Sequence, residues 1–194
     1  TAATQFNWLQ DDTVPTMTIT ASEVADGATS NDAALSLTFT SNEATSTFAV
    51  GDISVSNCAL SAFGTTSTTV YTATCTATAD GATTIDVAAS GFTDEAGNAN
   101  SAATQFNWLQ DDTVPTMVIT ASQGSDGFTS NDAALSLTFT SNEATVNFVK
   151  ADISVAGGTL GDLTGVSSTV YTATFTASAD GATTIDVAAS GFTD

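Results

Sequence analysis

Short runs of alternating apolar and polar residues recur along the chain and predict β-strands. Leu35, Leu37 and Phe39 alternate with serine and threonine, and the segment Tyr71–Ala77 alternates in the same way. A period of two buries one face of a strand and leaves the other face in water. Threonine and valine, which are abundant in these runs, favour strands over helices. The pattern therefore predicts an all-β fold.

Turn signals separate these runs, at Asp26-Gly27, Asp80-Gly81 and Gly97-Asn98. Strands that recur every 8 to 12 residues or so are typical of a β-sandwich or barrel. The strands expected in the first part of the chain are Met17–Ala21, Ala33–Thr40, Thr47–Val50, Ile53–Asn57, Ala59–Phe63, Val70–Ala77, Thr83–Ala89 and Ala102–Trp108.

The whole pattern occurs twice, because the sequence repeats itself with a period of about 100 residues. The segment that begins at Thr1 returns at Ser101, and about 70 of the 94 positions that align without a gap are identical. The differences gather in residues 23–28 and 46–69. A unit of this length is the size of a domain rather than of a solenoid repeat. We therefore expect a tandem array of whole domains.

The linkers Gln10–Pro15 and Gln110–Pro115 mark the borders of the repeats. We expect residues 1–10 to be the last strand of a preceding repeat and residues 11–110 to form one complete repeat. Residues 111–194 would form a second repeat that lacks its final strand. The simpler interpretation is a window on a longer array. The alternative is that Thr1–Gln10 of one copy completes the second repeat of another copy by strand addition.

The charge balance is extreme, with 21 acidic residues against a single basic one, Lys150, and a net charge of −20. Such a chain repels nucleic acid and anionic lipid, because both are bound through lysine and arginine. It also repels itself, which favours bound cations. No apolar run approaches the roughly 18 residues of a membrane-spanning helix, and no signal peptide opens this segment.

The residue types needed for most catalytic sites are missing. The chain has no histidine, which excludes Ser-His-Asp and Cys-His constellations. One lysine and no arginine leave no phosphoryl-transfer machinery. Paired carboxylates hydrolyse glycosides in some enzymes, but here the acids recur at linkers, where no substrate cleft is expected. We therefore expect no enzyme, no catalytic residue and no residue that binds an organic cofactor.

Five motifs in a fixed order carry a resemblance to a known family. They are Asp-Asp-Thr-Val-Pro-Thr at 11–16, Ser-Asn-Glu-Ala at 41–44, Gly-Asp-Ile-Ser-Val at 51–55, Tyr-Thr-Ala-Thr at 71–74 and Phe-Thr-Asp-Glu-Ala-Gly-Asn at 92–98. Together they resemble the bacterial-type Ig-like repeats of giant surface adhesins and filament proteins, which also occur in marine algal and protist surface proteins. The resemblance covers the whole chain. It implies tandem Ig-like β-sandwiches, a location outside the cell or at its surface, and often calcium at the domain junctions.

On an Ig-like sandwich, acidic residues that are distant in the sequence meet at one end of each domain, because consecutive strands run in opposite directions. Calcium takes six to eight oxygen ligands in irregular geometry, which suits carboxylates on loops. The expected calcium ligands are Asp11, Asp12, Glu43 and Asp94 in the first repeat, and Asp111, Asp112, Glu143 and Asp194 in the second.

The alternative for these acids is that aspartate simply favours turns. We assign Asp26 and Asp80 to turns, since a glycine follows each, although both face the junction at the other end of the domain. Asp52 and Asp152 precede strand residues, and we expect them to cap the backbone locally.

Both cysteines, Cys58 and Cys75, lie in the first repeat, and Gly158 and Phe175 replace them in the second. Two residues that change together are expected of a bonded pair, and disulfides persist in the extracellular setting that the resemblance implies. We predict a Cys58–Cys75 disulfide, worth about 3 kcal/mol by loop entropy. The alternative is two separate buried thiols, because Phe175 occupies the position of Cys75.

Near-identical repeats favour a structural and adhesive function, as in a stalk, fibre or filament stiffened by calcium, whose partners are neighbouring repeats of the same protein. The alternative is a module that binds a glycan or a surface protein through the divergent stretch 46–69 and its counterpart 146–169, which contains Lys150. Exposed aromatic residues would favour that alternative. The only aromatic residues in the first stretch are Phe48 and Phe63, and both are expected in the core.

Overall fold

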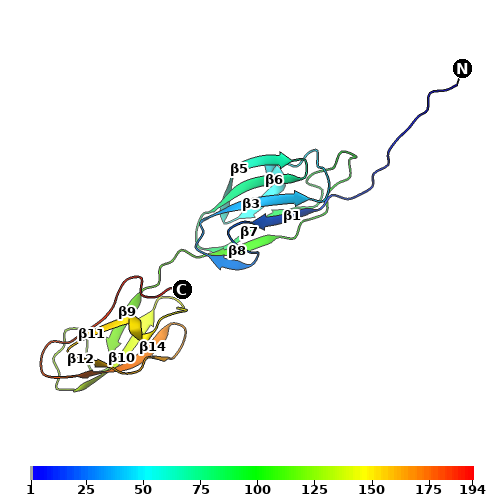
Figure 1. Cartoon of the computed structure of the whole chain (residues 1–194). Coiled ribbons are helices and arrows are strands. Elements are labelled where there is room, and N and C mark those ends of the chain that lie inside the picture. Colours follow the sequence, from blue (N-terminus) through cyan, green and yellow to red (C-terminus); the bar gives the residue numbers. More distant parts are fainter. Residues whose placement is uncertain (1) are drawn as a thin grey trace. The chain divides into compact units, whose positions relative to one another are not determined.

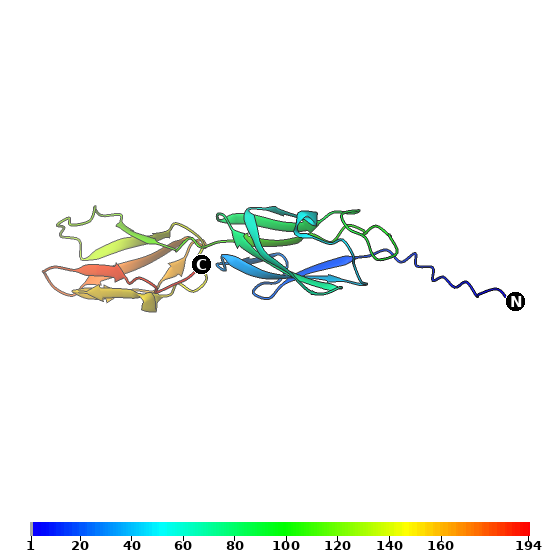
Figure 2. The ribbon, with the colours of Figure 1, turned by 90° about the horizontal axis from the view of Figure 1, so that it is seen from above.

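A computed structural model describes residues 2–194, which form two compact units divided between Thr113 and Val114. Each unit is built from β-strands in two facing layers (Figures 1 and 2). No α-helix occurs among the described residues, and the helical content is limited to two short 3-10 helices. The expected all-β sandwich is therefore confirmed.

The first unit contains two four-stranded sheets. One is antiparallel, with strands in the order β1 (Met17–Ala21), β3 (Ala34–Ser41), β6 (Val70–Ala77) and β5 (Cys58–Ser67). The other has the order β2 (Ala28–Ser30), β8 (Phe106–Gln110), β7 (Gly81–Val87) and β4 (Ile53–Ser56), with β2 parallel to β8. The 3-10 helix η1 (Val50–Asp52) precedes β4.

The core of the first unit lies between these sheets and follows the alternation seen in the sequence. Leu35, Leu37 and Phe39 on β3 are essentially fully buried. Trp108 on β8 packs into the same core from the opposite sheet. Full burial of each such side chain contributes about 1.5–3 kcal/mol, so this alternation supplies much of the stability of the unit.

The second unit repeats one sheet and part of the other. Its larger sheet has the order β12 (Gly158–Leu160), β14 (Val170–Ala177), β10 (Ala134–Ser141) and β9 (Met117–Ala121), and the short β13 (Thr164–Gly165) also pairs with β14. Its smaller sheet has only β11 (Ile153–Ala156), which follows the 3-10 helix η2 (Lys150–Asp152), and β15 (Thr184–Val187).

The prediction of a strand at Thr47–Val50 is wrong. Thr47 to Ala49 are in a loop, and η1 begins at Val50. The cause is Asp52, whose carboxylate Oδ2 accepts a hydrogen bond of 2.8 Å from the backbone N–H of Ala49 and so closes a tight turn. Asp152 does the same for Val149, also at 2.8 Å. The expected capping role of both aspartates is therefore confirmed.

Other boundaries shift, and one strand was missed. The last strand of the first repeat occupies Phe106–Gln110 rather than Ala102–Trp108. The strand expected at Ala59–Phe63 is longer, Cys58–Ser67, with register shifts that bend it along β6. Strand β2 has only three residues and no alternation long enough to recognise.

The predicted disulfide between Cys58 and Cys75 is confirmed. Cys58 is the first residue of β5, and Cys75 lies on the neighbouring β6, with no exposed surface. The two Cα atoms are 5.8 Å apart, in the usual range for a disulfide. The bridge therefore joins two paired strands at the edge of one sheet.

Candidate metal site

The loop between β7 and β8 holds Asp94 in a fixed position. The side chain is 3% exposed. Its Oδ1 accepts hydrogen bonds from the backbone N–H groups of Gly97 (2.7 Å) and Asn98 (2.8 Å), and its Oδ2 accepts one from Asn98 Nδ2 at 2.8 Å. Gly97 has a φ of 95°, which glycine adopts without strain. The loop is thus folded around the carboxylate.

The entry linker is attached to the same end of the first unit. The side chain of Asn98 donates a hydrogen bond to the backbone oxygen of Asp11 at 3.0 Å. Asn42, in the loop after β3, accepts a hydrogen bond from Thr16 N–H at 2.7 Å and donates a longer one to Val14 O. These contacts place Asp11 beside the two loops that carry the other acids.

Three carboxylates meet there, from Asp11, Glu43 and Asp94. One oxygen from each lies within 4.8 Å of the others. Glu43 is half-buried, and its Oε1 is shielded from solvent and has no hydrogen-bond partner among residues 2–194. The single basic residue of the chain, Lys150, lies in the other unit and pairs with Asp162 at 3.8 Å. The first unit itself contains no lysine or arginine that could offset the charge of the three acids.

The pKa values of two of the acids, Glu43 and Asp94, are shifted in opposite directions. Burial raises the pKa of Glu43, and the negative charges of Asp11 and Asp94 raise it further. Burial also acts to raise the pKa of Asp94, but hydrogen bonds from Asn98, Gly97 and Ala96 outweigh it and leave that pKa below its usual value. Asp94 is therefore stabilised as an anion, whereas ionised Glu43 is left under repulsion that a cation would relieve.

Hard oxygen donors on loops are what calcium accepts, and carbonyl groups and water complete its six to eight ligands. Zinc prefers nitrogen and sulfur, and the chain has no histidine while both cysteines are bonded to each other. The donor set of Asp11, Glu43 and Asp94 thus fits a calcium-like ion.

The second repeat has the same acids in its sequence, at Asp111, Glu143 and Asp194. Glu143 and Asp194 lie in the second unit, while Asp111 is on the first unit's side of the division. Asp194 is exposed, whereas its counterpart Asp94 is buried. Glu143 Oε1 accepts a hydrogen bond from Asn142 at 3.2 Å.

The two remaining expected ligands lie outside these acidic groups. Asp12 is exposed and is not part of the group that Asp11 joins. Asp112 instead meets Asp80 in the first unit, where its backbone N–H donates to Asp80 Oδ1 at 2.9 Å and Thr113 Oγ1 donates to Oδ2 at 2.7 Å. Hydrogen bonds from the Thr113 hydroxyl and, to a smaller extent, from the Asp112 N–H lower the pKa of Asp80. The carboxylate of Asp80 raises the pKa of Asp112.

Two aspartates assigned only to turns therefore have a second role. Asp80 holds the start of the exit linker, and Asp26 Oδ1 accepts a hydrogen bond from Asn107 N–H at 2.7 Å, next to β8. The Asp-Gly signal hides these roles in the sequence, because a turn alone explains an aspartate before a glycine. The signal that could reveal them is their placement in loops at the linker end of the repeat.

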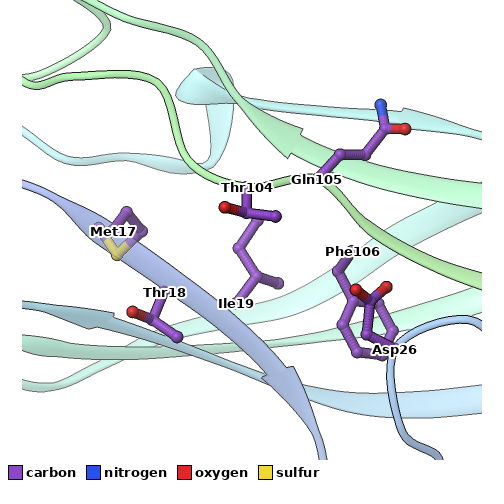
Figure 3. A pocket seen from close by; sticks show the side chains of 7 residues that line it. All are labelled: Met17, Thr18, Ile19, Asp26, Thr104, Gln105 and Phe106. Carbon is purple, nitrogen blue, oxygen red and sulfur yellow. The ribbon is translucent and has the colours of Figure 1, made fainter.

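A pocket in the first unit lies between β1 and β8 (Figure 3). It is lined by Met17, Thr18, Ile19, Asp26, Thr104, Gln105 and Phe106. Asp26 is its single ionisable group and is already bonded to Asn107. The pocket therefore lacks the paired acids that glycoside hydrolysis needs.

Comparison with known proteins points to one family. A family model described as a bacterial Ig-like domain matches residues 11–109 and, in a second copy, residues 111–194. No curated protein matches the sequence. Among residues 2–194, no helix has the length and apolar character needed to cross a membrane.

Proposed function

The chain belongs to the bacterial Ig-like domain family, and on this premise we propose that it is a structural and adhesive repeat of an extracellular stalk, fibre or filament. Family membership itself indicates a surface or structural repeat, and domains of this family are typically not enzymes. The disulfide between Cys58 and Cys75 supports a location outside the reducing cytoplasm. Near-identical consecutive repeats support a protein in which one domain is used many times.

In this proposal, calcium binds at the entry of each repeat and stiffens the linker. The observation that carries it is the shielded Oε1 of Glu43, for which the described part of the chain offers no hydrogen-bond partner, on a carboxylate that lies beside two others. A bound cation would supply the missing partner and offset the repulsion that raises the pKa of Glu43. Because Asp11 belongs to the linker, the ion would tie that linker to the loops of Glu43 and Asp94.

Calcium titration of the whole chain tests the site, by calorimetry and by thermal unfolding at constant ionic strength. We expect binding in the range of about 10⁻⁴ to 10⁻³ M, typical of extracellular modules, and a rise in the melting temperature of the first unit. Glu43→Gln should weaken binding to that site more than tenfold. It should also stabilise the calcium-free first unit, because it removes a repelled charge.

Glu95→Gln is the matched control, since Glu95 is exposed, adjacent to Asp94 and outside the acidic group. It removes the same charge and should leave calcium binding unchanged. Equal losses from the two variants would mean that calcium only screens a diffuse negative surface, and the site would be rejected.

A second candidate function, glycan or protein binding, is favoured by one observation in the second unit. The divergent stretch there exposes Val146, Val149 and Val166, and it lines most of a pocket that includes Lys150 and Asp162. Phe48 is buried in the first unit and Phe63 packs against that core, so neither forms an exposed aromatic surface. A screen of the chain against glycans and surface proteins, repeated with Val149→Asp, tests this candidate. Any ligand bound equally by the variant would exclude this surface.

A further inference from the structure

One tyrosine is anchored in the same way in both units but is covered in only one of them. Tyr71 on β6 is 4% exposed, whereas Tyr171 on β14 is partly exposed. The hydroxyl oxygen of each lies 2.6 Å from the Oγ1 of a threonine, Thr45 in the first unit and Thr145 in the second. The difference in exposure therefore comes from what packs against the ring.

In the first unit a third aromatic ring covers Tyr71. Phe63 on β5 lies nearly parallel to it, with ring centroids 6.1 Å apart and ring planes inclined by 13°. Phe63 also meets Phe48 nearly edge-on, at 5.9 Å. Phe48 and Tyr71 themselves lie 4.9 Å apart at 71°. The three rings thus form one cluster, at separations where aromatic pairs attract each other.

The second unit keeps two of these rings and lacks the third. Phe148 and Tyr171 lie 5.0 Å apart at 70°, essentially as in the first unit. Leu163 stands at the position of Phe63, and Gly165, which is paired with Tyr171, replaces a threonine. A Cβ atom at Gly165 would lie 3.6 Å from Tyr171 Cε1. Both changes remove side-chain atoms from beside the tyrosine ring.

A cavity of about 370 Å³ lies at this place in the second unit. Its wall includes Phe148, Leu163, Gly165 and Tyr171, the residues that match the surroundings of Phe63. The volume is in the range of about 300–1,000 Å³ that is typical of ligand pockets. The position that an aromatic ring fills in the first unit is therefore a cavity in the second.

The cavity is also charged, whereas the matching residues of the first repeat are not. Lys150 and Asp162 line it and pair at 3.8 Å, and their counterparts are Val50 and Ala62. The side chain of Asp162 is fully exposed. The second unit has eight acidic residues against this one lysine, so a basic segment is attracted to it.

We propose that this cavity binds an aromatic side chain, of the size of phenylalanine, that projects from a basic segment of a partner protein. The ring would lie against Tyr171 and Phe148, in the way that Phe63 packs in the first unit. A lysine or arginine beside it would face the carboxylate of Asp162. The inference rests on the second candidate function, because it concerns the same surface, and it does not depend on calcium.

Titration of the whole chain with blocked tripeptides tests the proposal, by nuclear magnetic resonance of the backbone amides with a calcium chelator present. Lys-Phe-Lys should shift the signals of Gly165 and Tyr171 and bind about tenfold more tightly than Lys-Ala-Lys, which has the same charge without the ring. Equal affinity of these two peptides would mean that the acidic surface attracts any cation, and the proposal would be rejected. Binding of Glu-Phe-Glu as tightly as Lys-Phe-Lys would contradict a basic partner.

Leu163→Phe is the sharpest variant, because it gives the second repeat the residue that fills this position in the first. It should weaken binding of Lys-Phe-Lys about tenfold and bury Tyr171. Val146→Phe is the matched control, since it adds the same ring at a position that is 77% exposed and outside the cavity wall, and it should leave binding unchanged. Undiminished binding by Leu163→Phe overturns the proposal.

Two further results separate this inference from the second candidate function. Gly165→Thr, which restores the other side chain of the first repeat, should also weaken binding of Lys-Phe-Lys, so the test does not depend on the stability of a single variant. A glycan or protein that loses affinity in Val149→Asp but still binds Leu163→Phe would keep the second candidate function and reject the aromatic partner.

Discussion

The two repeats secure the same edge of the same sheet by different means. In the first, a disulfide joins Cys58 on β5 to Cys75 on β6. In the second, Phe175 takes the place of Cys75 and is 1% exposed, with Gly158 beneath its ring. A Cβ atom at Gly158 would lie only 2.4 Å from Phe175 Cζ. The two positions therefore change together because a covalent bridge and an aromatic ring fill one space.

The comparison also shows how the length of the edge strand differs. Strand β5 in the first unit has ten residues, whereas its counterparts in the second are β12, with three, and β13, with two. Leu160, at the end of β12, is paired with Phe175 itself. Packing around one aromatic ring thus holds the edge in the second unit, and the bridge holds it in the first.

The largest effect is expected from Phe175→Ala, which removes the ring and leaves Gly158 facing a cavity. Such a change in a core costs about 3–5 kcal/mol, so the second unit should lose most of its stability while the first keeps its own. Calorimetry of the whole chain measures both transitions, and fluorescence of Trp108 identifies that of the first unit. Val166→Ala, at an exposed position of the same repeat, is the control. A small effect of Phe175→Ala would refute the ring's role.

A somewhat smaller effect is expected from removing the bridge. The double variant Cys58→Ala and Cys75→Ala should lower the stability of the first unit by about 3 kcal/mol. The second unit should not change, because it contains no cysteine. Thermal unfolding with and without a reductant measures the same difference in the unmodified chain. If reduction shifted both transitions equally, the two units would not be independent.

Replacing the disulfide of the first repeat by the glycine–phenylalanine pair of the second is expected to change the stability of the first unit less. Cys58→Gly together with Cys75→Phe gives the first repeat the pair found in the second. The variant loses the roughly 3 kcal/mol of the bridge, but burial of the ring contributes about 1.5–3 kcal/mol in its place, so its net cost should be smaller than that of the double alanine variant. Cys75→Phe alone keeps Cys58 where the ring must lie and should be worse than the double variant. Equal stability of the single and double variants would contradict a shared space.

The smallest effect concerns pH in the absence of calcium. The raised pKa of Glu43 means that its ionised form opposes folding, and protonation relieves this as the pH falls through that pKa toward its ordinary value of 4.5. The lowered pKa of Asp94 acts in the other direction, with stability present above its ordinary value of 3.8 and lost as the pH falls through the lowered one.

The first unit should therefore gain slight stability on acidification from pH 7 to about 5, before Asp94 titrates. Glu43→Gln should abolish this gain, and Glu95→Gln should keep it. Melting temperatures of the first unit across this range provide the measurement. An unchanged gain in Glu43→Gln would assign it to another acid.

Much of the fold could be predicted because its signals are local. Strands β1 and β6 have the predicted bounds, since strict alternation ends at both of their termini. Strand β2 was missed because three residues carry no period, and its pairing with β8 depends on a segment 80 residues away. The short helix η1 was mistaken for a strand because its cap depends on the rotamer of Asp52.

The candidate site, too, could be predicted only where its residues follow from local sequence and strand direction. Antiparallel topology alone predicts that Asp11, Glu43 and Asp94 share one end of a sandwich, and the structure places them together. The sequence does not separate Asp11 from its neighbour Asp12, because the direction of each side chain depends on how the linker is held. Asp80 was taken only for a turn residue because its partners, Asp112 and Thr113, lie more than 30 positions away.

The bridge between Cys58 and Cys75 also sets how far the first repeat can lengthen under tension. The cysteines are 17 positions apart, and the chain between them cannot be drawn out while the bond is intact. At about 3.3–3.6 Å per extended residue, the first repeat would yield roughly 55–60 Å less contour than an unbridged repeat such as the second. A pulled array of such domains would thus contain members of unequal extensibility, determined by one pair of residues.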